Sequence, residues 1–158
     1  MKLEEAKLIG ERVRAALSPY CERIEIVGSI RRARLIVHDI DMVLIPKQGD
    51  ELLLNTVLCS IGRIEMDGDK IKRLRRPDDI ELDIYLATPA TWGTLLLIRT
   101  GSAESNMRLA SLAKQKGWQI KANGDGLFDE DGNRIAGDTE ESIFEALGIP
   151  YQESHERG

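Results

Sequence analysis

The chain has 158 residues, of which 42% are hydrophobic and 31% charged, and its formal net charge is −5. This length and composition are typical of one folded domain, or one domain with a small appendage, and are unlike those of a disordered or collagen-like chain. No apolar run is long enough to span a membrane, and no secretory signal pattern is present. Two cysteines 38 residues apart argue against a disulfide framework or a zinc site, so we expect a reducing, intracellular compartment.

The patterns of the first 88 residues predict helices alternating with strands. Apolar residues recur at helical spacing up to Pro19, and later segments alternate polar and apolar residues as half-buried strands do. In chain order we expect a helix at 3–17, a strand at 24–27, a basic loop at 31–34, a strand at 39–45, a helix at 50–61 capped by Asp50, a hairpin of 63–67 and 70–76, and a strand at 79–87.

From Pro89 onward the chain becomes helical and then acidic, with eight acidic residues and one basic residue between positions 125 and 145. Thr88-Pro89 is a helix-start pair, and Gly101-Ser102 separates two helices. We expect helices at 89–99 and 103–116, short strands at 118–121, 126–129 and 134–136, a last helix opened by a capping box from Asp138 to Glu141, and a frayed tail after Tyr151.

Three aspartates are the strongest candidates for chemistry. Asp39 and Asp41 are two residues apart on an expected strand, so both carboxylates leave the same face. Asp83 lies on another strand, and three carboxylates converge if the two strands are neighbours. Hard divalent cations prefer oxygen ligands, and two of them can clamp the attacking and leaving oxygens of an in-line displacement. The alternative is a pair of solvent-facing carboxylates, and Glu81 competes with Asp83 for the place of third ligand.

Two basic segments accompany these acids. Gly28-Ser29 ends a strand just ahead of Arg31 and Arg32, where backbone, hydroxyl and guanidinium groups could donate to a phosphate. Residues 70–76 hold five bases in seven positions. A solvated hairpin is the ordinary explanation of such a run, and salt-dependent contact with nucleic-acid phosphates is the alternative.

The spacing of these motifs resembles that of the family X DNA polymerases. Gly28-Ser-Ile-Arg-Arg32 followed by Asp39-Ile-Asp41 is similar to their nucleotidyltransferase signature, which a wider superfamily shares. Leu82-Asp83-Ile84 resembles the strand of the third carboxylate. Thr100-Gly-Ser102 with Asn106-Met-Arg108, and residues 127–150, resemble the nucleotide segment and the C-terminal end that narrow the likeness to family X.

The resemblance extends from the first helix to about Tyr151 and implies an α/β (α+β) fold. Residues 1–88 would form a nucleotidyltransferase palm with a mixed sheet flanked by helices. Residues 89–158 would form a smaller helical and hairpin lobe on the nucleotide side. The lyase and helix-hairpin-helix domains of larger members have no counterpart in this sequence, so we expect a minimal member without lyase activity.

The resemblance also implies a role for each matching residue. Asp39 and Asp41 would bind two Mg²⁺ or Mn²⁺ ions, and Asp83 would complete the primer-side metal and accept the proton of the primer 3′-hydroxyl. Ser29 and Arg32 would bind the β- and γ-phosphates. The implied nucleotide-binding set is Gly28, Ser29, Arg32, His38, Thr100, Gly101 and Asn106, and the implied DNA-binding set is Arg31, Lys70, Lys72, Arg73, Arg75, Arg76 and Arg108.

The sequence departs from the family pattern at three places. His38 stands where a glycine usually precedes the first metal aspartate. Ile98-Arg99 replaces the aromatic pair that lines the sugar pocket, which leaves discrimination against ribonucleotides open. Glu81 stands two residues before the third aspartate, where relatives often carry an arginine.

We therefore expect a small template-directed DNA polymerase that fills short gaps in DNA repair. It would act as a monomer on primer-template or gapped DNA, consume dNTPs and release pyrophosphate, in the cytoplasm of a prokaryotic or viral system. A template-independent, RNA-directed or small-molecule nucleotidyltransferase is the alternative enzyme. A catalytically inactive nucleic-acid-binding module is the alternative of another class.

Overall fold

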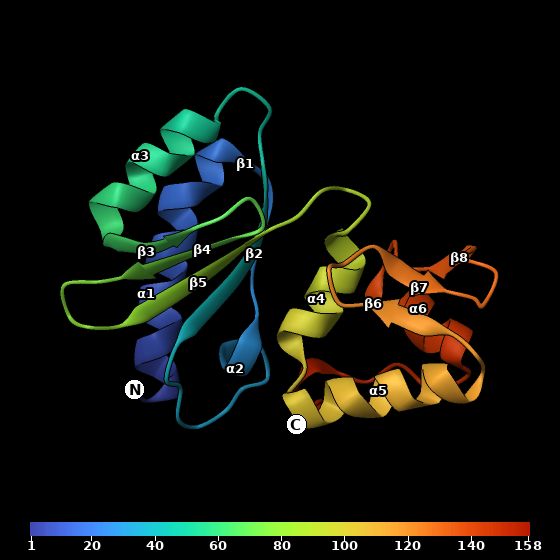
Figure 1. The fold of residues 1–158 in the computed structure, drawn as a ribbon. Coiled ribbons are helices and arrows are strands. Elements are labelled where there is room, and N and C mark those ends of the chain that lie inside the picture. Colours follow the sequence, from blue (N-terminus) through green and yellow to red (C-terminus); the bar gives the residue numbers. More distant parts are fainter. The chain divides into compact units, whose positions relative to one another are not determined.

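The computed structural model describes residues 1–158. It contains a five-stranded sheet and a three-stranded sheet (Figure 1). Each sheet belongs to one of two units, Met1–Ala87 and Thr88–Gly158. Each unit has its own cluster of buried apolar side chains. None of the helices is both long and apolar enough to cross a membrane.

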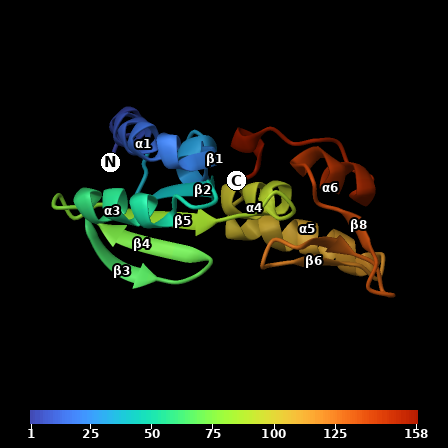
Figure 2. The same ribbon diagram turned by 90° about the horizontal axis from the view of Figure 1, so that it is seen from above.

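The first unit is a mixed sheet with two helices on one face. The strand order is β1-β2-β5-β4-β3, in which β2 and β5 are parallel and the other neighbours antiparallel. Figure 2 shows α1 and α3 on the same side of the sheet. The elements are α1 (Leu3–Leu17), η1 (Ser18–Tyr20), β1 (Cys21–Ile26), α2 (Gly28–Arg31), β2 (Ile40–Pro46), α3 (Glu51–Ile61), β3 (Arg63–Asp67), β4 (Ile71–Arg75) and β5 (Glu81–Leu86).

The alternation of side chains along β2 and β5 decides which residues reach the core. Ile40, Met42 and Leu44 are fully buried with Leu82 and Ile84, in one cluster with apolar residues of α1 and α3. Because successive side chains of a strand point to opposite faces, the aspartates between these residues leave the face that α1 and α3 do not cover. Burying the aliphatic set stabilises the strand register, since a one-residue slip would exchange the aspartates for the core residues.

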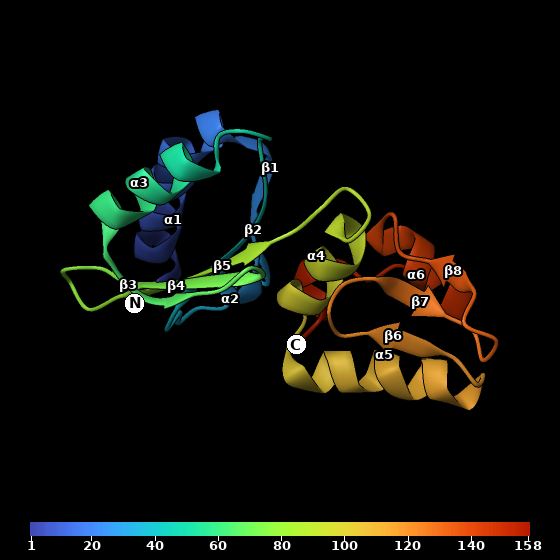
Figure 3. The same cartoon turned by 45° about the horizontal axis from the view of Figure 1, so that its top comes forward.

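The second unit packs three helices around a small antiparallel sheet. The sheet order is β6-β7-β8, and the core includes Leu97, Leu109, Leu127 and Phe144. Figure 3 shows α4, α5 and α6 beside these strands. The elements are α4 (Trp92–Thr100), α5 (Ala103–Gln115), β6 (Gln119–Lys121), β7 (Gly126–Phe128), β8 (Arg134–Ala136), α6 (Glu140–Leu147) and η2 (Ser154–Glu156).

The mixed sheet flanked by helices confirms the predicted α/β fold class, and the helices and hairpins lie close to their expected positions. The first helix spans the predicted residues, and Ser102 caps α5 by accepting a hydrogen bond from the backbone N–H of Ser105 at 3.1 Å. Neither cysteine forms a disulfide. The expected basic loop is partly wrong, because Gly28–Arg31 forms the helical turn α2.

Two predicted helix starts are wrong, by three residues and by one, and Asp50 occupies its predicted cap position without the expected hydrogen bond. The helix expected from Pro89 begins at Trp92, because Thr88 and Thr91 close a turn before it with hydrogen bonds between their own side chains and backbone. The capping box of α6 joins Thr139 to Ser142, one residue beyond the expected pair.

The tail after Tyr151 is ordered, which corrects the expectation that it frays. It forms η2 and ends with Arg157 fully buried. The Arg157 guanidinium pairs with the buried carboxylate of Glu140, and Ser102 donates its backbone N–H to the carbonyl oxygen of Arg157 at 3.0 Å. The end of the chain is therefore part of the packing of the second unit.

Candidate active site

Asp41 and Asp83 lie directly opposite each other on the parallel strands β2 and β5. Asp83 is buried and Asp41 is half-buried, whereas Asp39 is exposed one residue before β2 begins. Glu81 lies two residues before Asp83 on β5. Burial raises the pKa of its carboxyl and the charges of Asp83 and Asp39 raise it further, against the opposing effect of Arg73 and Arg75. The uncovered face of the sheet thus concentrates acidic side chains.

Gly28 allows the carboxylate of Asp41 to lie against the backbone that follows β1. Gly28 has φ +63°, and a Cβ atom built there would lie 2.2 Å from Oδ2 of Asp41. Any other residue would collide with the carboxylate and be strained in this conformation. The N–H of Val27 also donates to the Asp41 carbonyl oxygen at 2.8 Å, which ties the end of β1 to the start of β2.

Arg32 follows α2 and brings a guanidinium towards the same carboxylate. Burial lowers the pKa of Arg32 and the neighbouring charge of Arg34 lowers it further, whereas the carboxylate of Asp41 raises it. Ser29 is half-buried on α2, Arg31 is half-exposed, and His38 is exposed just ahead of Asp39. Of the residues predicted to contact the triphosphate, the structure therefore brings Gly28 and Arg32 to Asp41.

The acidic residues suit a hard cation in their chemistry. Carboxylate oxygens are the ligands that Mg²⁺ and Mn²⁺ prefer, and the strand register sets Asp41 beside Asp83. No three His, Cys, Asp or Glu side chains lie together in a geometry that could hold a metal ion. The carboxylate of Asp83 is instead engaged by Arg73. The metal set of Asp39, Asp41 and Asp83 stays a prediction.

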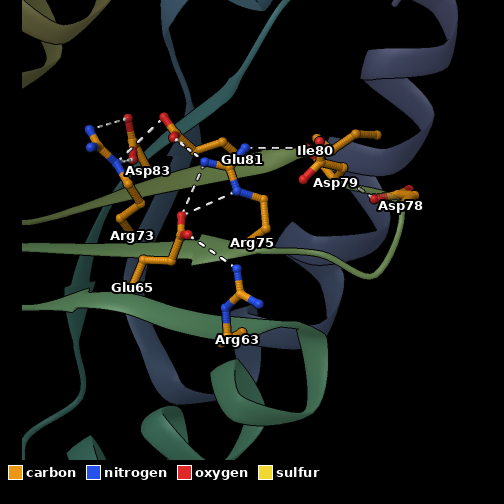
Figure 4. Close-up of polar contacts among 9 residues, drawn as sticks. All are labelled: Arg63, Glu65, Arg73, Arg75, Asp78, Asp79, Ile80, Glu81 and Asp83. Atoms are coloured by element: carbon orange, nitrogen blue, oxygen red, sulfur yellow. Dashed lines mark hydrogen bonds and ion pairs between the residues drawn. The ribbon is translucent and has the colours of Figure 1, made fainter.

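Bases of the run at residues 70–76 pair with acidic side chains of the same sheet, as Figure 4 shows for Arg73 and Arg75. Lys72 pairs with Asp67, and Arg76 pairs with Asp78 at 3.0 Å. The hydrogen bond from Arg76 lowers the pKa of Asp78, and the hydrogen bond from Arg75 lowers the pKa of Glu65. Six residues alternate in charge across β5, β4 and β3, and we name them the charge ladder: Asp83, Arg73, Glu81, Arg75, Glu65 and Arg63.

These pairs leave the predicted DNA contacts of the run untested. Lys70 is exposed in the turn before β4, whereas the other four bases reach acids of the same unit. A base whose charge is matched by a neighbouring acid attracts a phosphate less strongly than an unmatched one. The assignment of Lys70, Lys72, Arg73, Arg75 and Arg76 to DNA binding stays a prediction.

A second group of predicted residues meets in the turn between α4 and α5. Thr100 is fully buried at the end of α4, and Gly101 follows it. Asn106 donates from Nδ2 to the Ile98 carbonyl oxygen at 2.8 Å. A Cβ atom on Gly101 would lie 2.6 Å from Oδ1 of Asn106, so any other residue there would displace this amide. Arg108 is exposed on α5.

Sequence reasoning missed the contact between Arg73 and Asp83, although the chain carries a signal for it. Arg76 N–H donates to the Ile80 carbonyl oxygen at 2.9 Å, and the turn between them includes Asp79 at φ +69°. Counting outward from this closed turn places Arg73 opposite Asp83, as observed. A Pro-Asp-Asp segment between two strands is a turn signal that could have revealed the second hairpin.

Comparisons with known proteins find similarity to DNA polymerases. Residues 95–158 match the family model of the DNA polymerase beta thumb. DNA polymerase lambda of Rattus norvegicus is 27% identical over 187 residues, which cover 99% of this chain and 33% of that protein. The chain thus spans about a third of the length of this curated relative.

Solved structures of Leishmania infantum polymerase beta have the same fold. The ternary P/T complex matches with a TM-score of 0.82 and 20% identity, covering 100% of this chain and 76% of the other. The ternary gap complex matches with a TM-score of 0.83 and 20% identity, covering 99% and 70%. The thumb match at residues 95–158 and the similarity to the lambda enzyme agree with the resemblance found in the motifs, so the chain is similar to the family X polymerases in sequence and to polymerase beta in fold.

Proposed function

We propose that the protein is a small DNA-directed DNA polymerase that adds dNTPs to a primer 3′-hydroxyl and fills short gaps in DNA. The observation that carries the proposal is the placement of Asp41 directly opposite Asp83, with Asp39 two residues before Asp41. The similarity to DNA polymerases supports a polymerase-type activity. We further propose that it works as a monomer on primer-template or gapped DNA in the cytoplasm of a prokaryotic or viral system.

In the proposed reaction the primer 3′-oxygen forms a bond to the α-phosphorus of the dNTP. The bond from that phosphorus to the bridging oxygen breaks, and pyrophosphate leaves with the electron pair. Asp83 accepts the proton of the 3′-hydroxyl, and Asp39 and Asp41 share with Asp83 the role of cation ligands. Two bound Mg²⁺ ions would neutralise charge on the phosphates and stabilise the attacking and leaving oxygens.

The other proposed contacts position the nucleotide. Ser29 and Arg32 donate to the β- and γ-phosphates, for which a hydroxyl and a planar guanidinium are suited donors. Thr100 and Gly101 lie along the sugar, and Asn106 donates to the minor-groove edge of the incoming base. In this structure Nδ2 of Asn106 donates to the Ile98 carbonyl oxygen. In the proposed complex Asn106 gives up this hydrogen bond and donates to the base instead.

Primer extension on a duplex with a one-nucleotide gap tests the proposal. Each dNTP and each NTP is offered separately with Mg²⁺ or Mn²⁺, and a single-stranded primer serves as the comparison. Addition of the templated dNTP alone supports a template-directed DNA polymerase. Untemplated addition would instead indicate a terminal transferase. Triphosphate binding without addition would indicate another acceptor, and no triphosphate binding would indicate an inactive module.

Replacing Arg32 with alanine is expected to raise the KM for dNTP about 10- to 100-fold, because a hydrogen bond to a charged group contributes about 1.5–3 kcal/mol. Affinity for gapped DNA should stay unchanged, since Arg32 is assigned to the triphosphate. Steady-state extension and fluorescence anisotropy of labelled DNA measure the two quantities. Arg34→Ala removes an exposed arginine of the same segment and is the matched control. Equal losses in dNTP and DNA affinity would contradict the assignment of Arg32.

A further inference from the structure

Arg73 holds the carboxylate of Asp83 from the neighbouring strand (Figure 4). The antiparallel register of β4 and β5 places the two residues directly opposite each other. The guanidinium donates from Nε to Oδ1 at 2.7 Å and from Nη2 to Oδ2 at 3.3 Å. One planar fork therefore engages both oxygens, which is the arrangement that best fixes the orientation of a carboxylate.

The charge ladder keeps the Arg73 guanidinium in place. Nε of Arg73 lies 3.5 Å from Oε2 of Glu81, and the other oxygen of Glu81 accepts from Nη2 of Arg75 at 3.0 Å. Arg75 donates from Nε to Glu65 on β3 at 3.2 Å. Arg73 is thus held between two carboxylates and cannot leave Asp83 without also disturbing its contact with Glu81.

Burial differs between the two ends of the charge ladder, and Asp83 is its most buried member. The side chain of Asp83 is 8% exposed and that of Arg73 is 34% exposed, whereas that of Arg63 at the far end is 74% exposed. Water screens charges less where side chains are buried, so the pair at Asp83 is more strongly coupled than the pair of Arg63 with Glu65. In agreement, the pKa of Arg73 is raised, first by its hydrogen bonds to Asp83 and then by the charge of that carboxylate.

The same carboxylate faces Asp41 across β2 and β5. A carboxylate offers about four lone-pair positions, and a bidentate guanidinium occupies two of them. The remaining positions are available to a cation or to a proton. A cation that binds there experiences repulsion from the guanidinium, whose positive charge already offsets that of the carboxylate.

We propose that Arg73 is a positioning residue that fixes Asp83 for nucleotidyl transfer and at the same time weakens the affinity of this carboxylate for a divalent cation. The inference rests on the proposed function, which gives Asp83 its role. The sequence assigned Arg73 to the DNA-binding set, whereas in this proposal its role is to hold Asp83. The proposal also predicts effects of opposite sign, because removing the guanidinium strengthens cation binding while it loosens the reactive carboxylate.

Binding of Mn²⁺ alone, without DNA or nucleotide, measures the first effect by titration against the electron paramagnetic resonance signal of the free ion. Arg73→Ala should bind Mn²⁺ about tenfold more tightly than the wild type, because one positive charge within a few ångströms is removed. Arg73→Lys keeps the charge and should stay near the wild-type affinity. Arg63→Ala removes an arginine from the exposed end of the ladder and should leave the affinity unchanged. Asp83→Asn should weaken binding.

Gap-filling kinetics measure the second effect. Arg73→Ala should lower kcat about a hundredfold with little change in the KM for dNTP, since a small misplacement of a reacting group costs about that factor. Arg73→Lys should also lower kcat, because an ammonium group cannot reproduce the bidentate fork. Far-ultraviolet circular dichroism on heating shows whether each variant keeps its fold, and Arg73→Lys keeps the test valid if Arg73→Ala does not.

The outcomes separate this inference from the function on which it rests. Wild-type protein that neither binds Mn²⁺ nor extends a primer would overturn both. If the wild-type protein does both, folded Arg73→Ala that binds Mn²⁺ no more tightly would overturn the effect on cation affinity, and folded Arg73→Ala with an unaltered kcat would overturn the positioning role, while the proposed function would stand. If Arg73→Ala does not fold, unaltered kcat in Arg73→Lys overturns the positioning role.

Discussion

Replacing Asp83 with asparagine is expected to slow templated nucleotide addition by about 10²–10⁴-fold, the range typical of losing a general base. Asparagine keeps the shape of the side chain, but it carries no charge and cannot accept the primer proton. Single-turnover extension on a one-nucleotide gap measures the rate. Affinity for gapped DNA, measured by fluorescence anisotropy, should stay within about twofold, because Asp83 is buried and does not serve as a phosphate contact.

A matched substitution distinguishes this effect from a general loss of charge. Asp69 is an exposed aspartate in the turn between β3 and β4, and Asp69→Asn should extend primers at the wild-type rate. If Asp83→Asn retained more than about a tenth of the wild-type rate, Asp83 would not be the proton acceptor. Loss of DNA affinity together with the rate would instead point to a disturbed sheet, since Asp83 is also the partner of Arg73.

The sequence was most informative where periodicity and charge act together. The alternation around Asp41 and Asp83 predicted two strands with carboxylates on one face, and the register observed between β2 and β5 follows from burying Ile40, Met42, Leu82 and Ile84. A register shifted by one residue would bury the aspartates under α1 and α3. Local hydrophobic pattern therefore defines this part of the sheet almost completely.

Interactions between distant or competing polar groups were harder to predict. The capping box of α6 falls on Thr139 and Ser142, although Asp138 is an equally good cap in sequence terms. Glu81 stands where relatives often carry an arginine. In this chain the guanidinium beside Asp83 comes instead from Arg73 on β4, which the strand register places opposite Asp83. Such pairings depend on strand order, which the periodicity of a single segment does not contain.

The tail shows the same limit in the second unit. Gln152 to Gly158 is short, polar and terminal, which is typical of a frayed end. The deciding feature is a set of contacts made by Arg157, whose guanidinium lies 5.2 Å from the ring centroid of Phe144 on α6 and 5.2 Å from that of Tyr151. The same guanidinium donates to the Gln152 carbonyl oxygen at 2.8 and 3.0 Å and pairs with Glu140.

Replacing Arg157 with alanine is accordingly expected to destabilise the second unit by about 3–5 kcal/mol, because it removes the cation from a buried pair and leaves the carboxylate of Glu140 buried. Trp92 and Trp118 both belong to Thr88–Gly158, and the chain has two tryptophans, so tryptophan fluorescence reports the unfolding of this unit alone. Urea titration of the full chain gives the free energy of unfolding from that signal.

Two further variants show whether the buried pair is the cause. Arg108→Ala removes an exposed arginine from α5 and should change the free energy by less than about 0.5 kcal/mol. Arg157→Met combined with Glu140→Leu should recover much of the stability lost in Arg157→Ala, because apolar residues of similar volume can replace a buried ion pair at little cost.

An Arg157→Ala midpoint equal to that of Arg108→Ala would show that the ordered tail adds nothing to the stability of the unit. A double variant as unstable as Arg157→Ala would place the effect in the contacts of Arg157 with Gln152 and the aromatic rings, rather than in its pair with Glu140.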